Sequence, residues 1–362
     1  MQYVEIIKQS FLFFPVLAFF ITIPFIVSNY HKYGAIHKLR TLIIYSFVLY
    51  LLTIYFLVIL PLPSIEEVRE MTTPIMNLVP FSFVVDFIKE TPLVLSDPST
   101  YILALKHSSV YVVVFNIFMT IPFGMYLRYY YKCSFKKTIL LSFLLSLFFE
   151  ITQLTGLYFI YPRAYRLFDV DDLILNTLGG GVGYFVVALI SKYLPSREKI
   201  DEETKELSKV VSPLRRLTIC FIDLFLYLLF TIILGIFLRI GGRIFLVSFL
   251  LYYLVLPLLM HDATIGSKFL NVRKKVDKNP IFMYIMYSIF QAVYFFVLPS
   301  LLFVIFGSVI GKVSNILVGL FLMLVVFSFF LVFYVGNLIY LFRHKKMFYD
   351  ELFKLEYVST LK

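Results

Sequence analysis

The sequence predicts an all-α polytopic membrane protein with about nine transmembrane helices, in a five-helix and a four-helix module. Hydrophobic residues make up 60% of the 362 residues and charged residues 15%, whereas soluble domains contain about 45–50% and about 25%. The mean hydropathy is +0.90. With 15 Gly, 15 Pro and 2 Cys, collagen-like, disordered and disulfide-rich classes are excluded.

Nine stretches are apolar and long enough to cross a bilayer, which takes about 20 residues in a helix. They lie at about 10–28, 41–61, 108–128, 138–160, 172–191, 217–238, 244–260, 281–306 and 314–342. The first is followed by Tyr30, His31 and Lys32 and not by a small-residue cleavage site. This favours a membrane span over a signal peptide.

The basic residues predict an orientation. Alternate connections hold 23 of the 33 Lys and Arg residues, against 9 in the others. The richer connections are 29–40, 129–137, 192–216, 261–280 and 343–362. By the positive-inside rule, we expect a multi-pass protein of the cell membrane with its N-terminus outside and its C-terminus in the cytoplasm. The net charge of +11 follows from this distribution, which argues against nucleic-acid binding.

The same pattern predicts the domain organisation. A first membrane module covers residues 1–194 and includes a long outer loop, 62–107. A mixed-charge stretch, 195–212, is expected to be a cytoplasmic linker. A second membrane module follows at 213–345, and residues 346–362 form a cytoplasmic tail.

The outer loop contains a predicted amphipathic helix that begins after Pro80. Phe81, Val84, Val85 and Ile88 have the i, i+3, i+4, i+7 spacing of one apolar helix face. Two interpretations stay open for this helix. It lies in the outer membrane interface, or it packs over the mouth of the helix bundle.

Polar residues inside the apolar spans predict a functional site, because ionisable groups are costly in hydrocarbon. We expect eight side chains of the first module to converge near the outer leaflet. They are Asn77, Asn116, Glu150, Gln153, Arg166, Asp169, Asp172 and Asn176. Membrane lipids are the general partner of such a site.

Glu150 is the most informative of these residues. It stands about ten residues from the outer end of its expected span, or about 15 Å deep. An unpaired carboxylate at that depth protonates or finds a cation, and Arg166 is the nearest candidate partner. Three interpretations stay open: a structural Glu–Gln–Asn–Arg network, an outward-facing recognition or catalytic site, and a proton relay.

Glycines in the fifth span predict close helix packing. Gly179 and Gly183 have the GxxxG spacing, and Asn116, Thr120 and Gly124 place a small or polar stripe along the third span. No GxSxG, HExxH or Walker sequence occurs, and the five His residues are scattered. We therefore expect no metal and no cofactor.

Residues about 40–190 resemble the VanZ-like family of bacterial membrane proteins. The matching runs include Asn77-Leu78-Val79-Pro80-Phe81, Ile121-Pro122-Phe123-Gly124 and Glu150-Ile151-Thr152-Gln153. The most specific run extends from Arg166 through Asp169, Asp171, Asp172 and Asn176 to Gly180. This resemblance implies low-level resistance to glycopeptide antibiotics of the teicoplanin type.

Residues about 213–345 resemble the RDD family. Arg216 and Asp223 fit its first-helix Arg and Asp, and Thr264-Ile265-Gly266-Ser267-Lys268 is similar to its Thr-x-Gly-Lys run, with Ser267 where Lys is usual. The resemblance implies a loose link to transport. Together the two resemblances imply a VanZ/RDD protein.

Three function classes follow. The first is a non-enzymatic binding protein whose outer polar site engages a lipoglycopeptide or a lipid-linked wall precursor. The second is an intramembrane enzyme acting on a lipid or such a precursor, with Glu150 or Asp172 as general base. The third is a transporter, in which the second module forms part of a path.

Overall fold

The computed structural model describes residues 2–238, 241–260, 263–276, 280–312 and 315–361. Within this part of the chain, eight helices are long and apolar enough to cross a membrane. They cover Val4–Tyr33, Lys38–Ile59, Ser108–Tyr129, Phe135–Leu154, Val170–Tyr193, Pro213–Leu238, Ile281–Ile310 and Ile316–His344. The fold class predicted from the sequence, an all-α polytopic membrane protein, is confirmed.

The seventh predicted span differs from the other eight. Residues 244–260 contain a shorter apolar helix, Ile244–Leu259. It consists of α12 (Ile244–Leu250), the π-helical turn η3 (Leu251–Val255) and α13 (Leu256–Leu259). The preceding Arg239 and the following His261 and Asp262 lie outside the described residues.

The chain divides into two compact units, each described by itself. Unit 1 consists of Met1–Ile21 and Lys38–Ile200. Its long helices are α1 (Gln2–Tyr33, shared with unit 2), α2 (Lys38–Ile59), α6 (Ser108–Tyr129), α7 (Phe135–Leu154) and α9 (Val170–Ile190). Its short helices are α3 (Ile65–Glu70), α4 (Ser82–Glu90), α5 (Ser99–Leu105), α8 (Gly156–Phe159) and η1 (Ser191–Tyr193). The helix α10 (Arg197–Ser208) begins in unit 1 and ends in unit 2.

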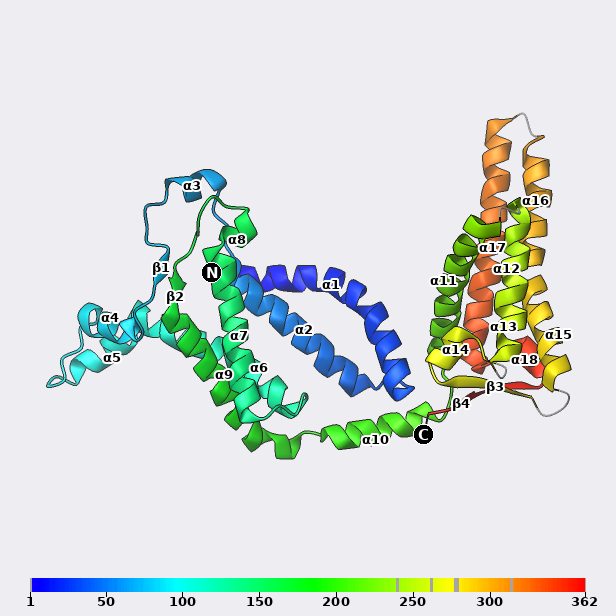
Figure 1. Cartoon of the computed structure of the whole chain (residues 1–362). Coiled ribbons are helices and arrows are strands. Elements are labelled where there is room, and N and C mark those ends of the chain that lie inside the picture. The colour runs from blue at the N-terminus through cyan, green and yellow to red at the C-terminus, as the bar shows by residue number, and fades with distance from the viewer. Residues whose placement is uncertain (1, 239–240, 261–262, 277–279, 313–314, 362) are drawn as a thin grey trace. The chain divides into compact units, whose positions relative to one another are not determined.

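Helices α6, α7 and α9 pack together into the centre of unit 1 (Figure 1). Glycines permit the close approach: a Cβ on Gly124 would lie 1.9 Å from the carbonyl oxygen of Gly180, and one on Gly183 would lie 2.0 Å from that of Ile121. Side chains of any size would force these backbones apart. The predicted role of these glycines in helix packing is confirmed.

The α7 face that meets α9 carries small hydroxyl side chains. Thr138, Ser142 and Ser146 follow one another at i, i+4 spacing, and each is fully buried. The Ser142 Oγ lies 2.0 Å from where a Cβ on Gly180 would stand. The hydroxyl stripe on α7 therefore fits against the glycines of α9, and Glu150 continues it by one turn.

The end of α7 is a correction to the predicted span 138–160. The helix ends at Leu154, and Gly156–Phe159 form one left-handed turn with φ values of 58°, 54°, 57° and 70°. Left-handed residues cannot continue a right-handed helix. Glu150 thus lies one turn from the end of α7 and not ten residues from it. Its carboxylate is near the end of the bundle, where a charge costs less.

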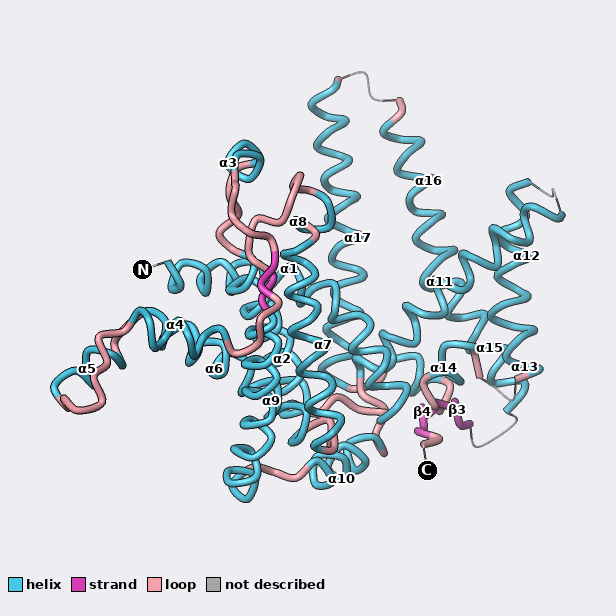
Figure 2. Tube along the Cα trace, turned by 60° about the vertical axis from the view of Figure 1, so that its left-hand side comes forward, coloured by secondary structure: helices cyan, strands magenta, loops and turns pink. Residues whose placement is uncertain are grey.

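The polar loops at this end of unit 1 are tied together by two short strands. β1 (Met76–Asn77) pairs in parallel with β2 (Phe168–Asp169), with Asn77 opposite Asp169. Figure 2 shows this strand pair in magenta beside α8 and α9. The pairing joins the loop after α2 to the residues immediately before α9.

Unit 2 consists of Thr22–His37 and Asp201–Lys362. Its helices are α11 (Pro213–Leu238), η2 (Gly241–Arg243), α12, η3, α13, α14 (Ile265–Phe269), α15 (Pro280–Ala292), the π-helical turn η4 (Val293–Val297), α16 (Leu298–Ile310), α17 (Ile316–His344) and α18 (Phe348–Leu352). The strands β3 (Val272–Val276) and β4 (Leu355–Ser359) form an antiparallel pair.

Buried polar contacts hold α11 to the rest of unit 2. The Asp223 carboxylate accepts from the Thr264 hydroxyl at 2.5 Å, from the Gly266 amide at 2.8 Å and from the Tyr252 hydroxyl at 3.0 Å. The Arg216 guanidinium forms a 2.6 Å ion pair with Asp350 of α18. These contacts anchor α14 and the C-terminal tail on α11.

Candidate binding site at the start of helix α9

The start of α9 gathers four carboxylates from α7 and α9. Asp169 caps the helix, because its side chain accepts from the Asp171 amide at 2.9 Å. The buried Glu150 accepts from the Asp169 amide at 3.0 Å. Asp172 stands in the first turn of α9, and its backbone carbonyl accepts from Ser146, one turn before Glu150 on α7. We name Glu150, Asp169, Asp171 and Asp172 the carboxylate cluster.

Asn77 reaches this cluster through the β1–β2 pairing. Its side-chain amide lies 3.3 Å from both carboxylate oxygens of Asp169 and donates to the Ser82 hydroxyl at 2.8 Å. The strand register places the two residues opposite each other. Asn77 therefore contacts the cluster at Asp169.

Asn116 and Asn176 lie around Asp172 of the carboxylate cluster. The Asn116 amide donates to the Asp172 carboxylate. One turn further along α9, the Asn176 amide donates to the Ser146 hydroxyl at 2.9 Å, and Ser146 donates to the Asp172 carbonyl at 3.1 Å. The Asn176 Oδ1 is buried and has no hydrogen-bond partner among the described residues. The site thus retains one unused acceptor beside the cluster.

Asp171 has a separate role. It is 3% exposed and accepts three hydrogen bonds from the first residues of α4: the Phe81 amide at 2.6 Å, the Ser82 hydroxyl at 2.8 Å and the Phe83 amide at 3.0 Å. The amides at a helix start have no partner within the helix. Asp171 supplies that partner and fixes the start of α4 at the start of α9.

Arg166 does not pair with Glu150, contrary to the expectation from the sequence. Its guanidinium donates to the carbonyl oxygens of Val58 and Leu60, both at 2.7 Å, at the end of α2. Gln153 donates to the same Val58 oxygen at 3.0 Å. The last carbonyls of a helix lack intrahelical donors, which makes them strong competitors for a guanidinium.

Arg163 and Tyr165 of the same loop also donate hydrogen bonds to backbone carbonyl oxygens. Arg163 donates to the carbonyl oxygens of Met71 and Thr73. The Tyr165 hydroxyl donates to the Ile59 carbonyl oxygen at 3.2 Å, and burial raises the pKa of Tyr165 to about 12, so this donor is present at neutral pH. These hydrogen bonds therefore hold the loop after α7 against the end of α2 and the segment that follows it.

Of the eight predicted residues, the structure brings six together and separates two. The first group is Asn77, Asn116, Glu150, Asp169, Asp172 and Asn176, and the second is Gln153 and Arg166. Sequence reasoning left Asp171, Ser82 and Ser146 out of the site. The i, i+4 spacing of Thr138, Ser142, Ser146 and Glu150 was the available signal for Ser146.

The charge of the site follows from these contacts. Both nearby guanidinium groups donate to backbone carbonyls, and Arg163 and Arg166 are half-buried, as are Asp169 and Asp172. The four carboxylates of the cluster outnumber these two arginines. Within the described ranges, no three His, Cys, Asp or Glu side chains form a group able to hold a metal ion.

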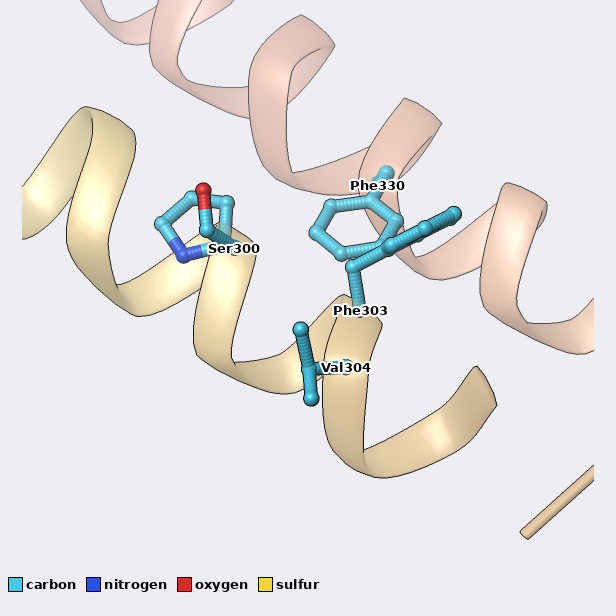
Figure 3. A pocket seen from close by; sticks show the side chains of 5 residues that line it. Ser300, Phe303, Val304 and Phe330 are labelled. Carbon is cyan, nitrogen blue, oxygen red and sulfur yellow. The ribbon is translucent and has the colours of Figure 1, made fainter. Parts of the chain in front are cut away.

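Two surface depressions occur elsewhere, in unit 2. One lies between α16 and α17, where Figure 3 shows Ser300, Phe303 and Val304 beside Phe330. The other is lined by Ile23, Ile26 and Val27 of α1 and by Leu217, Thr218 and Phe221 of α11. Both are shallow and mostly apolar, as expected of surfaces that face lipid acyl chains.

The long apolar helices define the chain as a multi-pass membrane protein. Residues 47–191 match the family model described as VanZ/LLP1, so this part of the chain is VanZ-like. The match includes all eight predicted site residues and does not extend into residues 213–345. No curated protein and no solved structure matches the chain.

Proposed function

We propose that the chain is a cell-envelope membrane protein of the VanZ type whose carboxylate cluster binds an amphiphile that carries an ammonium group. The observation that carries the proposal is the excess of carboxylates over guanidinium groups at the start of α9. Glu150, Asp169, Asp171 and Asp172 gather there, whereas the hydrogen bonds of Arg163 and Arg166 go to backbone carbonyls.

The proposal extends to resistance against glycopeptides of the teicoplanin type. A lipoglycopeptide has an acyl chain and a cationic peptide core. The acyl chain suits the apolar helix surfaces, and the core suits the carboxylates at their ends. The distribution of Lys and Arg supports an outer position for the start of α9. Binding at this position would lower the amount of antibiotic that reaches its target.

The test compares binding and resistance in matched variants. Asp172→Asn removes one charge and retains an oxygen that can accept from Asn116. Glu90→Gln, on the exposed side of α4, removes one charge away from the site. We expect Asp172→Asn to weaken binding of teicoplanin to protein in nanodiscs by about 10- to 100-fold, the loss of one charged hydrogen bond. Glu90→Gln should bind as the unaltered protein does.

Ligand chemistry provides the second comparison. A probe with a free amine and the same probe with that amine acetylated differ only in the cation. We expect the acetylated probe to bind about 10-fold or more weakly to the unaltered protein. Equal binding of the two probes, or unaltered binding and resistance in Asp172→Asn, would refute the proposal. Conversion of a lipid or a lipid-linked precursor by the unaltered protein would instead identify an enzyme.

A further inference from the structure

The apolar side of α4 is exposed although the helix is firmly placed. Val84, Val85 and Ile88 are 41%, 46% and 68% exposed. They are the residues predicted to form the apolar face of an amphipathic helix. Described side chains cover this face only in part, which favours the membrane interface over packing at the mouth of the bundle.

Hydrogen bonds at its start and packing against α6 fix the position of α4. Asp171 accepts three hydrogen bonds from Phe81, Ser82 and Phe83, and α4 packs against α6. Asp171 belongs to the first turn of α9, and α6 begins at Ser108. The start of α4 is thus tied to the start of α9, and the helix packs against α6, both of them candidate membrane spans.

The exposed apolar surface continues beyond α4. The following loop and α5 expose Leu95, Ile102, Leu103 and Leu105 by 60% or more. The helix α6 then exposes Tyr111, Val112 and Phe118 along a span of high hydropathy. Exposed apolar side chains thus occur on α4, on α5 and on the apolar span α6, against which α4 packs.

We propose that α4 and α5 lie in the membrane interface, with Val84, Val85 and Ile88 among lipid acyl chains. The occupant of this face is a lipid monolayer, because α4 packs against α6, a candidate membrane span whose own apolar side chains Tyr111, Val112 and Phe118 are exposed. Asp86, Lys89 and Glu90 are exposed on α4 and supply its water-facing groups. An apolar face beside charged groups at a span end is the arrangement of an interfacial helix.

The chain has no Trp, so a single introduced Trp reports its own surroundings without background. Ile88→Trp places the probe on the apolar face of α4, and Asp86→Trp places it on the opposite face. Val84→Trp, one turn before Ile88, serves as a second probe if Ile88→Trp folds poorly. Each variant is reconstituted in vesicles of phosphatidylcholine with and without brominated acyl chains.

We expect brominated lipid to reduce the emission of Ile88→Trp or Val84→Trp at least twofold, with a blue-shifted maximum. Asp86→Trp should respond to aqueous acrylamide and little to brominated lipid. Two results overturn the proposal. Quenching of Ile88→Trp by acrylamide to the same extent as Asp86→Trp would place the face in water, and quenching by neither agent would place it under protein. Neither result depends on whether the carboxylate cluster binds a ligand.

Discussion

Arg166 and Gln153 donate hydrogen bonds to the same acceptor, the carbonyl oxygen of Val58, at 2.7 and 3.0 Å. The two side chains come from the loop after α7 and from α7 itself, and they meet at the end of α2. The hydrogen bonds of Arg166 thus go to the end of α2 and not to a carboxylate. The shared acceptor also makes the loop after α7 a structural element of unit 1.

Replacement of Arg166 should destabilise unit 1. Arg166→Ala removes both donors to Val58 and Leu60, and we expect a loss of about 2 kcal/mol, since hydrogen bonds from charged groups contribute about 1.5–3 kcal/mol and Arg166 is only half-buried. Thermal unfolding in detergent, followed by circular dichroism, measures the change. Arg69→Ala is the control, because Arg69 is exposed on α3. Equal unfolding temperatures for the two variants would contradict the role assigned to Arg166.

The glycine contacts predict a sharp difference between two Gly→Ala substitutions. In Gly183→Ala the new Cβ would lie 2.0 Å from the Ile121 carbonyl oxygen, so α6 and α9 must separate. We expect a loss of about 1–3 kcal/mol or more, as for other overpacked interiors. Gly319→Ala on α17 has no atom within 4 Å of its Cβ and should be neutral or slightly stabilising. A similar fraction of folded protein for both, by size-exclusion chromatography, would show that α6 and α9 pack less closely.

The hydrogen bonds to Asp171 predict the rate of hydrogen exchange at the start of α4. Asp171→Ala removes the acceptor for the amides of Phe81 and Phe83, and we expect their hydrogen exchange to accelerate about 10- to 100-fold. Hydrogen–deuterium exchange followed by mass spectrometry of peptides over residues 78–90 measures it. Glu90→Ala, at the exposed end of the same helix, should leave exchange at the start of α4 unchanged. Slow exchange in Asp171→Ala would mean that other contacts hold α4 in place.

In unit 2, the ion pair between Arg216 and Asp350 should contribute strongly to folding. Its side chains are 8% and 1% exposed, and Asp350 also accepts from the Met347 amide and the Tyr287 hydroxyl. Asp350→Ala leaves a buried guanidinium without its partner, which costs about 3–5 kcal/mol. The control is Glu351→Ala, which removes the exposed pair with Lys346 and should change little. Limited proteolysis with trypsin at Lys354, directly before β4, distinguishes the two, because only Asp350→Ala should release the C-terminal strand.

The sequence was sufficient for the helices and for the residue types of the site. Spans predicted at 108–128 and 172–191 agree with α6 and α9 to within two residues, because hydropathy records helix length directly. The sequence did not predict the residue at which α7 ends. The left-handed turn Gly156–Phe159 lies in a stretch that is apolar throughout, and hydropathy carries no information on backbone handedness.

The sequence also did not predict which groups form hydrogen bonds with one another within the site. Asp169, Asp172 and Glu150 were predicted to converge, and they do. Arg166 had two kinds of acceptor within reach, a carboxylate and free carbonyls at a helix end, and only the course of the loop decides between them. The β1–β2 pairing is two residues long, too short for a period of two to be recognised.

The helix α1 supplies residues to both units: up to Ile21 it belongs to unit 1, and from Thr22 to unit 2. Tyr30 of this helix is 2% exposed in the core of unit 2, where it packs with Ile219 and Leu270. A gene cut anywhere in α10 would therefore yield a carboxyl-terminal half that lacks a piece of its own interior. We therefore expect the two halves to be inherited, expressed and exchanged between genes as one polypeptide. A second half on its own would need a separate peptide in place of the first helix.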